Sequence, residues 1–138
     1  AYPKHQSPLI LREALLVGFF LAGLVVLGGL QGWWLQPILE TMSPTAVFYG
    51  SLALTAITDN AALTYLGSLV QGTSPEFKLA LVGGAVAGGG LTVIANAPNP
   101  AGLAILRSYF PNAAVSAGLL FVAAIPPTIV AILALRLL

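Results

Sequence analysis

The chain has 138 residues, of which 58% are hydrophobic and only 7% are charged, and its net charge is +1. A soluble domain carries about 25% charged residues, so a water-exposed fold of this composition would lack polar surface. The weak charge excludes a basic surface for nucleic acid, and the absence of cysteine excludes disulfides and thiol chemistry. We therefore expect an all-α integral membrane protein of the cell inner (plasma) membrane, with a single membrane domain over residues 1–138.

Four apolar regions are candidates for membrane segments, because a helix needs about 20 apolar residues to cross the hydrocarbon core. The first runs from Ala14 to about Leu30, after a polar leader that contains Lys4, His5 and Arg12. The stretch that follows, QGWWLQPILETMSPT, holds two tryptophans, which suit the membrane interface, and then a proline and a glutamate. It predicts a short interfacial segment beyond the end of the first span.

The second region, from Thr45 to Val70, is long enough to cross the membrane but carries Asp59 and Asn60 at its middle. A polar connector, QGTSPEFK, follows it. Within this connector Ser74–Glu76 has the order of a helix start: a capping serine, a proline in the first turn and an acid near the positive end. We expect a new helix to begin there.

The third region, from Leu79 to Leu106, is rich in glycine and contains NAPNPAG, whose composition disfavours a continuous helix. We predict a helix from about Phe77 to Gly90, an unwound stretch centred on Asn96 to Pro100, and then a half-helix to Arg107. The sequence leaves open whether this region crosses the membrane or turns back as a re-entrant hairpin.

The fourth region, from Ala113 to Leu135, is uncharged and should form the last span, kinked at Pro126–Pro127. The few basic residues orient the chain only through the rule that cytoplasmic ends are positive. By that rule the basic leader puts the N-terminus in the cytoplasm. Glu40 then lies on the far side, and Lys78 returns to the cytoplasmic side.

Two of these regions share a short motif. LTAITDN at Leu54–Asn60 is similar to LTVIANA at Leu91–Ala97, with Asp59 in the position of Asn96. Each copy precedes an expected break, and secondary transporters often pair two interrupted helices at corresponding positions around a mid-membrane site. The pattern predicts that the two breaks face each other. Chance recurrence in an apolar chain is the alternative.

Asp59 is the residue on which the functional prediction depends. A charge at the centre of a spanning helix is costly, so such residues face a bundle interior or an aqueous cavity and mark ion or proton paths. Burial favours the protonated form of a carboxyl group and a nearby cation favours the charged form, so one carboxylate binds either H⁺ or Na⁺. Asp59 could instead be the N-cap of a second half-helix, and the two roles are compatible.

Further oxygen ligands come from amides and hydroxyls near the two breaks, since hard cations prefer oxygen. The predicted cation- and proton-binding residues are Asp59, Asn60, Thr55, Thr58, Thr92, Asn96 and Asn99. Pro98 and Pro100 are predicted to hold the second break extended, because a residue before proline avoids helical geometry. An ordinary turn outside the membrane is the alternative for this Asn-Pro stretch.

The remaining motifs concern packing and the absence of catalytic chemistry. Gly84 and Gly88 have the GxxxG spacing of closely packed membrane helices. The sequence offers no Ser/His/Asp set, paired carboxylates or metal-binding cluster, and so no catalytic residues. We expect neither an enzyme nor a cofactor, with Na⁺ and H⁺ as transported ions.

Three stretches resemble the putative Na⁺/H⁺ antiporter family, within a broad superfamily of ion transporters: GFFLAGLVVLGGLQGWWLQPIL, LTAITDNAALTYLGSLV and GAVAGGGLTVIANAPNPAG. The resemblance covers the chain from about Arg12 to Phe110. It implies a dimeric secondary transporter with inverted repeats, re-entrant hairpins and broken helices that exchanges Na⁺ for H⁺. By position, it implies that Asp59 and Asn60 belong to one broken segment and Asn96 to Pro100 to the other. The chain is shorter than such transporters, so we expect the C-terminal portion of a longer one.

The leading hypothesis is therefore a secondary transporter that exchanges a monovalent cation, Na⁺, for H⁺ by alternating access. It would work in the lipid bilayer with the rest of the transporter or a partner membrane subunit, as a homo-oligomer and without nucleic acid. The alternative is a small membrane subunit that does not transport and that scaffolds a larger complex. A channel-like pore is disfavoured because no repeated ring of charges is evident.

Overall fold

The computed structural model describes residues 11–137 and is built from helices, with no strand among these residues. In chain order the elements are α1 (Leu11–Gly29), α2 (Gly32–Thr41), α3 (Pro44–Ile57), α4 (Asn60–Ser68), α5 (Pro75–Gly88), α6 (Asn99–Leu106), the 3₁₀ helices η2 (Arg107–Tyr109) and η3 (Pro111–Ala113), and α7 (Ala117–Leu137). The expected all-α class is confirmed for the described part of the chain. The leader residues Lys4 and His5 lie outside the described residues.

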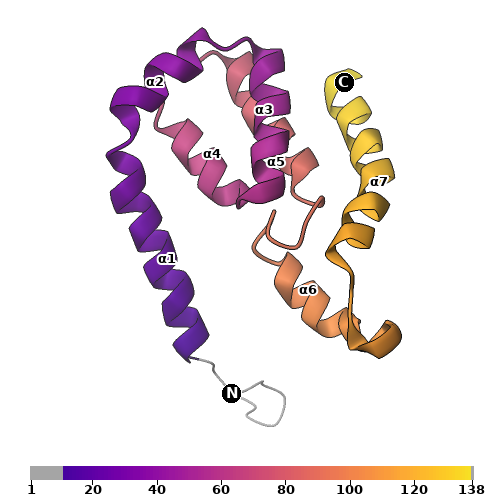
Figure 1. Cartoon of the computed structure of the whole chain (residues 1–138). Coiled ribbons are helices and arrows are strands. Elements are labelled where there is room, and N and C mark those ends of the chain that lie inside the picture. Colours follow the sequence, from indigo (N-terminus) through magenta and orange to yellow (C-terminus); the bar gives the residue numbers. More distant parts are fainter. Residues whose placement is uncertain (1–10, 138) are drawn as a thin grey trace, which may run out of the picture.

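α1 and α2 form a bent pair (Figure 1). The axes of Ala14–Gly29 and Gly32–Thr41 differ by 74° across a short break. At the break, Trp34 donates its indole N–H to the side-chain oxygen of Gln31 at 2.6 Å, and Trp33 is 82% exposed. The bend therefore falls where the sequence predicts that the first span ends and an interfacial segment begins.

Helix length separates α7 from the other apolar regions. Within residues 11–137, α7 is the one helix that is long and apolar enough to cross a membrane by itself, and the α1–α2 pair meets the same criterion together. α3 and α5 have 14 residues each and α4 has 9, fewer than the roughly 20 that a crossing needs. Two of the four predicted apolar regions, the second and the third, are thus interrupted helices.

Serine caps fix the starts of α3 and α5. The Ser43 hydroxyl accepts the Ala46 N–H at 3.2 Å, and the Ser74 hydroxyl accepts the Phe77 N–H at the same distance. A proline follows each serine at the start of the helix, where its missing N–H is not needed. The predicted helix start at Ser74 is confirmed.

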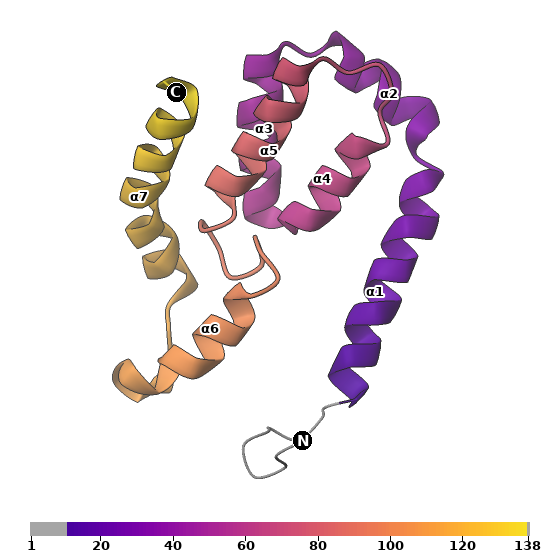
Figure 2. The same cartoon turned by 180° about the vertical axis from the view of Figure 1, so that it is seen from behind.

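α3 and α4 form a helical hairpin. Figures 1 and 2 show α3 running away from the end of the molecule that carries α2, and α4 returning toward that end. Leu63 and Gly67 of α4 share an apolar pocket of about 290 Å³ with Val47 and Leu54 of α3, which places the two helices side by side. The chain reverses direction at Asp59.

This reversal corrects the expected placement of two charged residues. Glu40 and Lys78 were expected on opposite sides of the membrane because the region between them was expected to cross it once. The α3–α4 hairpin instead brings the chain back, so that α2 and the first turn of α5 lie at the same end of the molecule (Figures 1 and 2).

The most extensively packed helix pair in the described chain is α3 with α5. An added Cβ on Gly84 would collide with the carbonyl oxygen of Phe48, and one on Gly88 would lie 2.5 Å from the carbonyl oxygen of Leu52. The GxxxG packing that the sequence predicts is confirmed, because glycine lets the two backbones approach this closely. The surrounding hydrophobic core consists of Val47, Phe48, Phe77, Ala80, Leu81 and Ala87.

The third apolar region is interrupted earlier than predicted. α5 ends at Gly88, residues 89–98 are irregular, and α6 begins at Asn99. The unwound stretch is therefore not centred on Asn96 to Pro100. Pro98 caps α6 with helical φ/ψ values and Pro100 lies in its first turn, where a missing N–H costs nothing, so these prolines begin a helix rather than hold the break extended.

α7 runs without interruption from Ala117 to Leu137, and the helix continues through Pro126–Pro127. The expected kink there does not end the helix. Near the C-terminus, Arg136 donates to the Thr45 hydroxyl at 3.0 Å, and its guanidinium carbon lies 5.5 Å from the centre of the Phe48 ring. α7 therefore ends beside the start of α3, at the end of the molecule that carries α2 (Figure 1).

Candidate functional site

Asp59 lies at the tip of the α3–α4 hairpin. α3 ends at Ile57, and α4 begins at Asn60 with Asp59 as its N-cap. One carboxylate oxygen, Oδ1, accepts the backbone N–H groups of Ala61 at 2.8 Å and Ala62 at 3.2 Å, and the side chain is half-buried. Among residues 11–137 no donor is hydrogen-bonded to Oδ2, so the cap leaves one carboxylate oxygen for a further ligand.

The side chain of Asn99 bridges two points of the second break, residues 89–98. Asn99, the first residue of α6, donates from Nδ2 to the carbonyl oxygens of Gly89 at 2.8 Å and Thr92 at 2.9 Å. Its backbone N–H donates to the carbonyl oxygen of Asn96 at 3.0 Å. Both hydrogens of the amide are then in use, which leaves the amide oxygen as the atom that could bind a cation.

The two breaks touch each other. The Asn60 backbone N–H donates to the Ala95 carbonyl oxygen at 3.2 Å, and the Thr92 hydroxyl donates to the Ala56 carbonyl oxygen at 2.7 Å. An added Cβ on Gly89 would lie 3.3 Å from Nδ2 of Asn60. The juxtaposition of two breaks that the repeated motif predicts is present, and hydrogen bonds to backbone oxygens join them.

Helix ends converge on this junction. α3 and α5 direct their C-termini toward it, and α4 and α6 begin at it (Figures 1 and 2). A helix C-terminus carries a partial negative charge and unpaired carbonyl oxygens, whereas an N-terminus carries a partial positive charge. The two C-termini therefore favour a cation at the junction and the positive end of α6 opposes one, while the Asp59 carboxylate compensates the positive end of α4.

The predicted ligands differ in where their side chains lie. Half-buried residues at the junction are Asp59, Asn60, Thr92, Asn96 and Asn99. Thr55 is fully buried in the last turn of α3, whereas Thr58 is exposed and its hydroxyl donates to the Leu54 carbonyl oxygen at 2.7 Å. Sequence reasoning missed the carbonyl oxygens of Ala56 and Ala95 as acceptors, because a backbone atom leaves no residue-type signal.

Comparison with known proteins identifies the family of the chain. A protein-family model described as "Putative Na+/H+ antiporter" matches residues 1–138, which is the whole chain. The chain belongs to this family. No curated protein and no solved structure gives a significant match.

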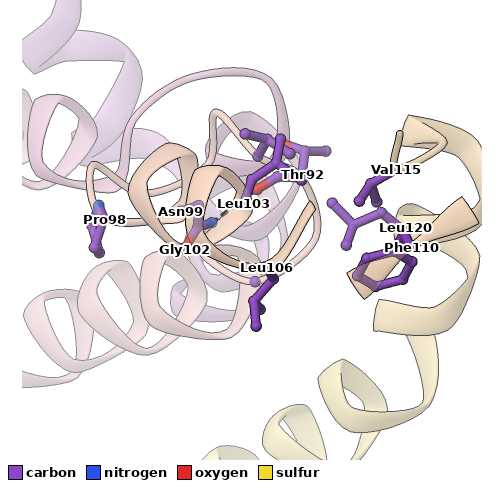
Figure 3. A pocket seen from close by; sticks show the side chains of 11 residues that line it. Thr92, Pro98, Asn99, Gly102, Leu103, Leu106, Phe110, Val115 and Leu120 are labelled. Atoms are coloured by element: carbon purple, nitrogen blue, oxygen red, sulfur yellow. Dashed lines mark hydrogen bonds between the residues drawn. The ribbon is translucent and has the colours of Figure 1, made fainter. Parts of the chain in front are cut away.

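A pocket of about 300 Å³ lies beside the second break of this antiporter-family chain (Figure 3). Thr92 and Asn99 contribute polar side chains at the break, Phe110 lines the pocket from the segment before α7, and Leu120 lines it from the first turn of α7. Asp59 is not part of its lining. The pocket thus gives mainly apolar space next to the loop that Asn99 holds, and it does not extend to the hairpin tip.

Proposed function

We propose that this chain is the C-terminal portion of a secondary transporter that exchanges Na⁺ for H⁺ by alternating access in the plasma membrane, and that it is not an enzyme. The family description supports the exchanged ions, and the apolar helices support a membrane location. The observation that carries the proposal is the hydrogen-bonded contact between two helix breaks beside the half-buried Asp59.

The proposed site suits a monovalent cation. Of the four acidic residues in the sequence, Asp59 is the one that lies at a break, and within residues 11–137 no group of three or more His, Cys, Asp or Glu side chains could hold a metal ion. A single carboxylate with neutral amide, hydroxyl and carbonyl oxygens matches the charge of Na⁺, whereas divalent sites commonly use several carboxylates. A proton competes for the same carboxylate, as exchange requires.

The α3–α4 hairpin supplies a means of alternating access in this proposal. Both of its helices are too short to cross a bilayer, so the hairpin would enter from one side and turn back at Asp59. In Figure 1 the junction lies at mid-height, and α6 continues toward the opposite end of the molecule. A shift of the hairpin against α5 would then open the Asp59 site to one side or the other.

The proposed transporter needs both lipid and further protein around this chain. The chain exposes 9653 Å² of surface, whereas a compact soluble protein of this size exposes about 6700 Å². Most of the exposed large side chains on α1 and α7 are apolar, for example Phe19, Val26, Leu119 and Val130. We propose that lipid covers part of this surface and that the rest of the transporter, a partner membrane subunit or a second copy covers the remainder.

Replacing Asp59 by asparagine tests the assignment. Asparagine keeps the size of the side chain and a capping oxygen but cannot exchange a proton. Na⁺-driven H⁺ flux in vesicles that contain the full-length protein should fall to background in Asp59→Asn. Glu40→Gln, at an exposed position of α2, is the matched control and should retain flux.

Two outcomes would contradict the proposal. Unaltered flux in a folded Asp59→Asn variant would refute the role of this carboxylate. A folded wild-type protein that carries no Na⁺-dependent flux, and that purifies in a stable complex with other membrane subunits, would favour the scaffold instead.

A further inference from the structure

The Thr55 hydroxyl differs from the neighbouring hydroxyls in α3 and at its C-cap. Those of Ser51 and Thr58 each donate to the carbonyl oxygen four residues earlier, at 2.6 and 2.7 Å. This bond is the usual way in which a serine or threonine satisfies its hydroxyl within a helix. Thr55 is 0% exposed, and its hydroxyl has no hydrogen-bond partner among residues 11–137.

Thr55 also lies close to the junction of the two breaks. It precedes Ala56, whose carbonyl oxygen accepts the Thr92 hydroxyl from the second break, and it precedes Asp59 by four residues. Ser51, one turn earlier on the same face of α3, lies against Gly84 of α5. Thr55 therefore continues the α3–α5 interface toward the break.

A buried hydroxyl without a partner is unfavourable, and the great majority of such groups in folded proteins are hydrogen-bonded. Its oxygen keeps lone pairs that can bind a cation. Unlike a carboxylate, a hydroxyl does not take up a proton near neutral pH. A hydroxyl ligand thus adds affinity for Na⁺ without adding affinity for H⁺.

We propose that the Thr55 hydroxyl is an inner ligand of the cation site, where it binds Na⁺ that has lost its water and so favours Na⁺ over H⁺. This inference rests on the proposed exchange at Asp59. Asp59 binds either ion, whereas Thr55 binds Na⁺ alone. Loss of the Thr55 hydroxyl weakens Na⁺ binding and leaves the protonation of Asp59 in place.

Three variants of the full-length protein in a membrane mimetic separate this role from packing. Thr55→Val removes the hydroxyl and keeps the shape, Thr55→Ser keeps the hydroxyl, and Ser51→Ala removes a buried hydroxyl that is already bonded within the same interface. Na⁺ that binds the folded state raises the melting temperature, which is measured against NaCl with choline chloride as the balancing salt. Thr55→Val should raise the half-saturating Na⁺ concentration by about tenfold or more. Thr55→Ser and Ser51→Ala should stay close to wild type.

The melting temperature measured without Na⁺ is a second readout. If Thr55 is a ligand, Thr55→Val weakens Na⁺ binding but does not lower this melting temperature. Thr55→Val should melt at or above the wild-type temperature, because a methyl group of the same shape removes an unpaired polar atom. A lower melting temperature would mean that the hydroxyl is bonded within the protein, and it would overturn the ligand role. An unchanged half-saturating Na⁺ concentration would overturn it as well, as expected for a hydroxyl that binds only a buried water.

Failure of the proposed exchange has a different signature. A wild-type protein whose melting temperature does not respond to Na⁺ contradicts the exchange and the Thr55 proposal together. A wild-type response that Thr55→Val shares in full contradicts the role of Thr55 alone.

Discussion

Asn99 connects the two helix breaks although it touches only one of them. Its amide donates to the Thr92 carbonyl oxygen, and the Thr92 hydroxyl donates to the Ala56 carbonyl oxygen of α3. Because the Asn99 side chain holds the loop of residues 89–98, it also fixes the position of the Thr92 hydroxyl, which is hydrogen-bonded to the end of α3. In the proposed mechanism, Asn99 positions the junction and need not bind the ion itself.

Replacing Asn99 by alanine should therefore loosen residues 89–98. The change removes two hydrogen bonds to half-buried backbone oxygens, at a cost of about 1–3 kcal/mol. Amide hydrogen exchange in this segment should accelerate by about tenfold or more, and Na⁺-dependent flux should fall. Asn112→Gly is the control, because Asn112 lies in an exposed turn whose φ of 58° suits glycine. Unchanged exchange in Asn99→Ala would mean that the loop is held by other contacts.

At the scale of elements, the α3–α5 pair depends on two glycines that face backbone rather than side chains. A methyl group on Gly84 or Gly88 would have to move the carbonyl groups of Phe48 or Leu52, and overpacking of this kind costs about 1–3 kcal/mol. Gly88→Ala should lower the melting temperature by several degrees, since about 1 kcal/mol corresponds to a few degrees for a domain of this size. Gly23→Ala in α1, where an added Cβ meets nothing within 4 Å, should leave it unchanged or raise it by a few degrees, because alanine favours a helix over glycine. Equal melting temperatures for the two variants would contradict the close approach.

The sequence predicted those features of the helices that depend on neighbouring residues, and it did not predict those that depend on distant contacts. The start of α5 depends on Ser74 and its following proline, which lie next to each other, so the prediction was confirmed. The reversal at Asp59 was not predictable, because an N-cap satisfies the N–H groups of α4 whatever the angle to α3. α4 makes contacts with residues that are distant in the sequence, and the sequence does not show these contacts. An added Cβ on Gly67 would collide with Leu81, and the Tyr65 hydroxyl donates to the Val25 carbonyl oxygen at 3.4 Å.

In the site, too, the sequence predicted the residues that carry a motif but not the contacts between distant segments. The repeated motif located Asp59 and Asn96 beside two breaks that meet, although the second copy, Leu91–Ala97, lies within its break instead of preceding it. The carbonyl oxygens of Ala56 and Ala95 could not be predicted, because which backbone oxygens face a neighbouring segment depends on the packing of α3 against α5.

At the scale of the whole molecule, the two broken segments have different topologies. The α3–α4 segment returns to the end from which it came, whereas the α5–α6 segment continues toward the opposite end (Figures 1 and 2). The two copies of the motif are therefore not related as equivalent halves of a structural repeat within this chain. An arrangement of this kind puts a hairpin tip against an interrupted crossing segment, which gives an ion site access from either side in the proposed mechanism.

Cysteine labelling tests this topology directly, because the native sequence contains no cysteine. Ser43→Cys and Gln71→Cys lie at exposed positions before α3 and after α4, and Asn112→Cys lies in the exposed turn before α7. If the hairpin returns within the membrane, a membrane-impermeant maleimide should label the first two from the same side of oriented vesicles and Asn112→Cys from the other side. A continuous crossing by α3 and α4 would instead place Gln71→Cys opposite Ser43→Cys. Labelling of Gln71→Cys from the same side as Asn112→Cys would therefore contradict the hairpin. It would also contradict the mid-membrane position of Asp59, on which exchange depends.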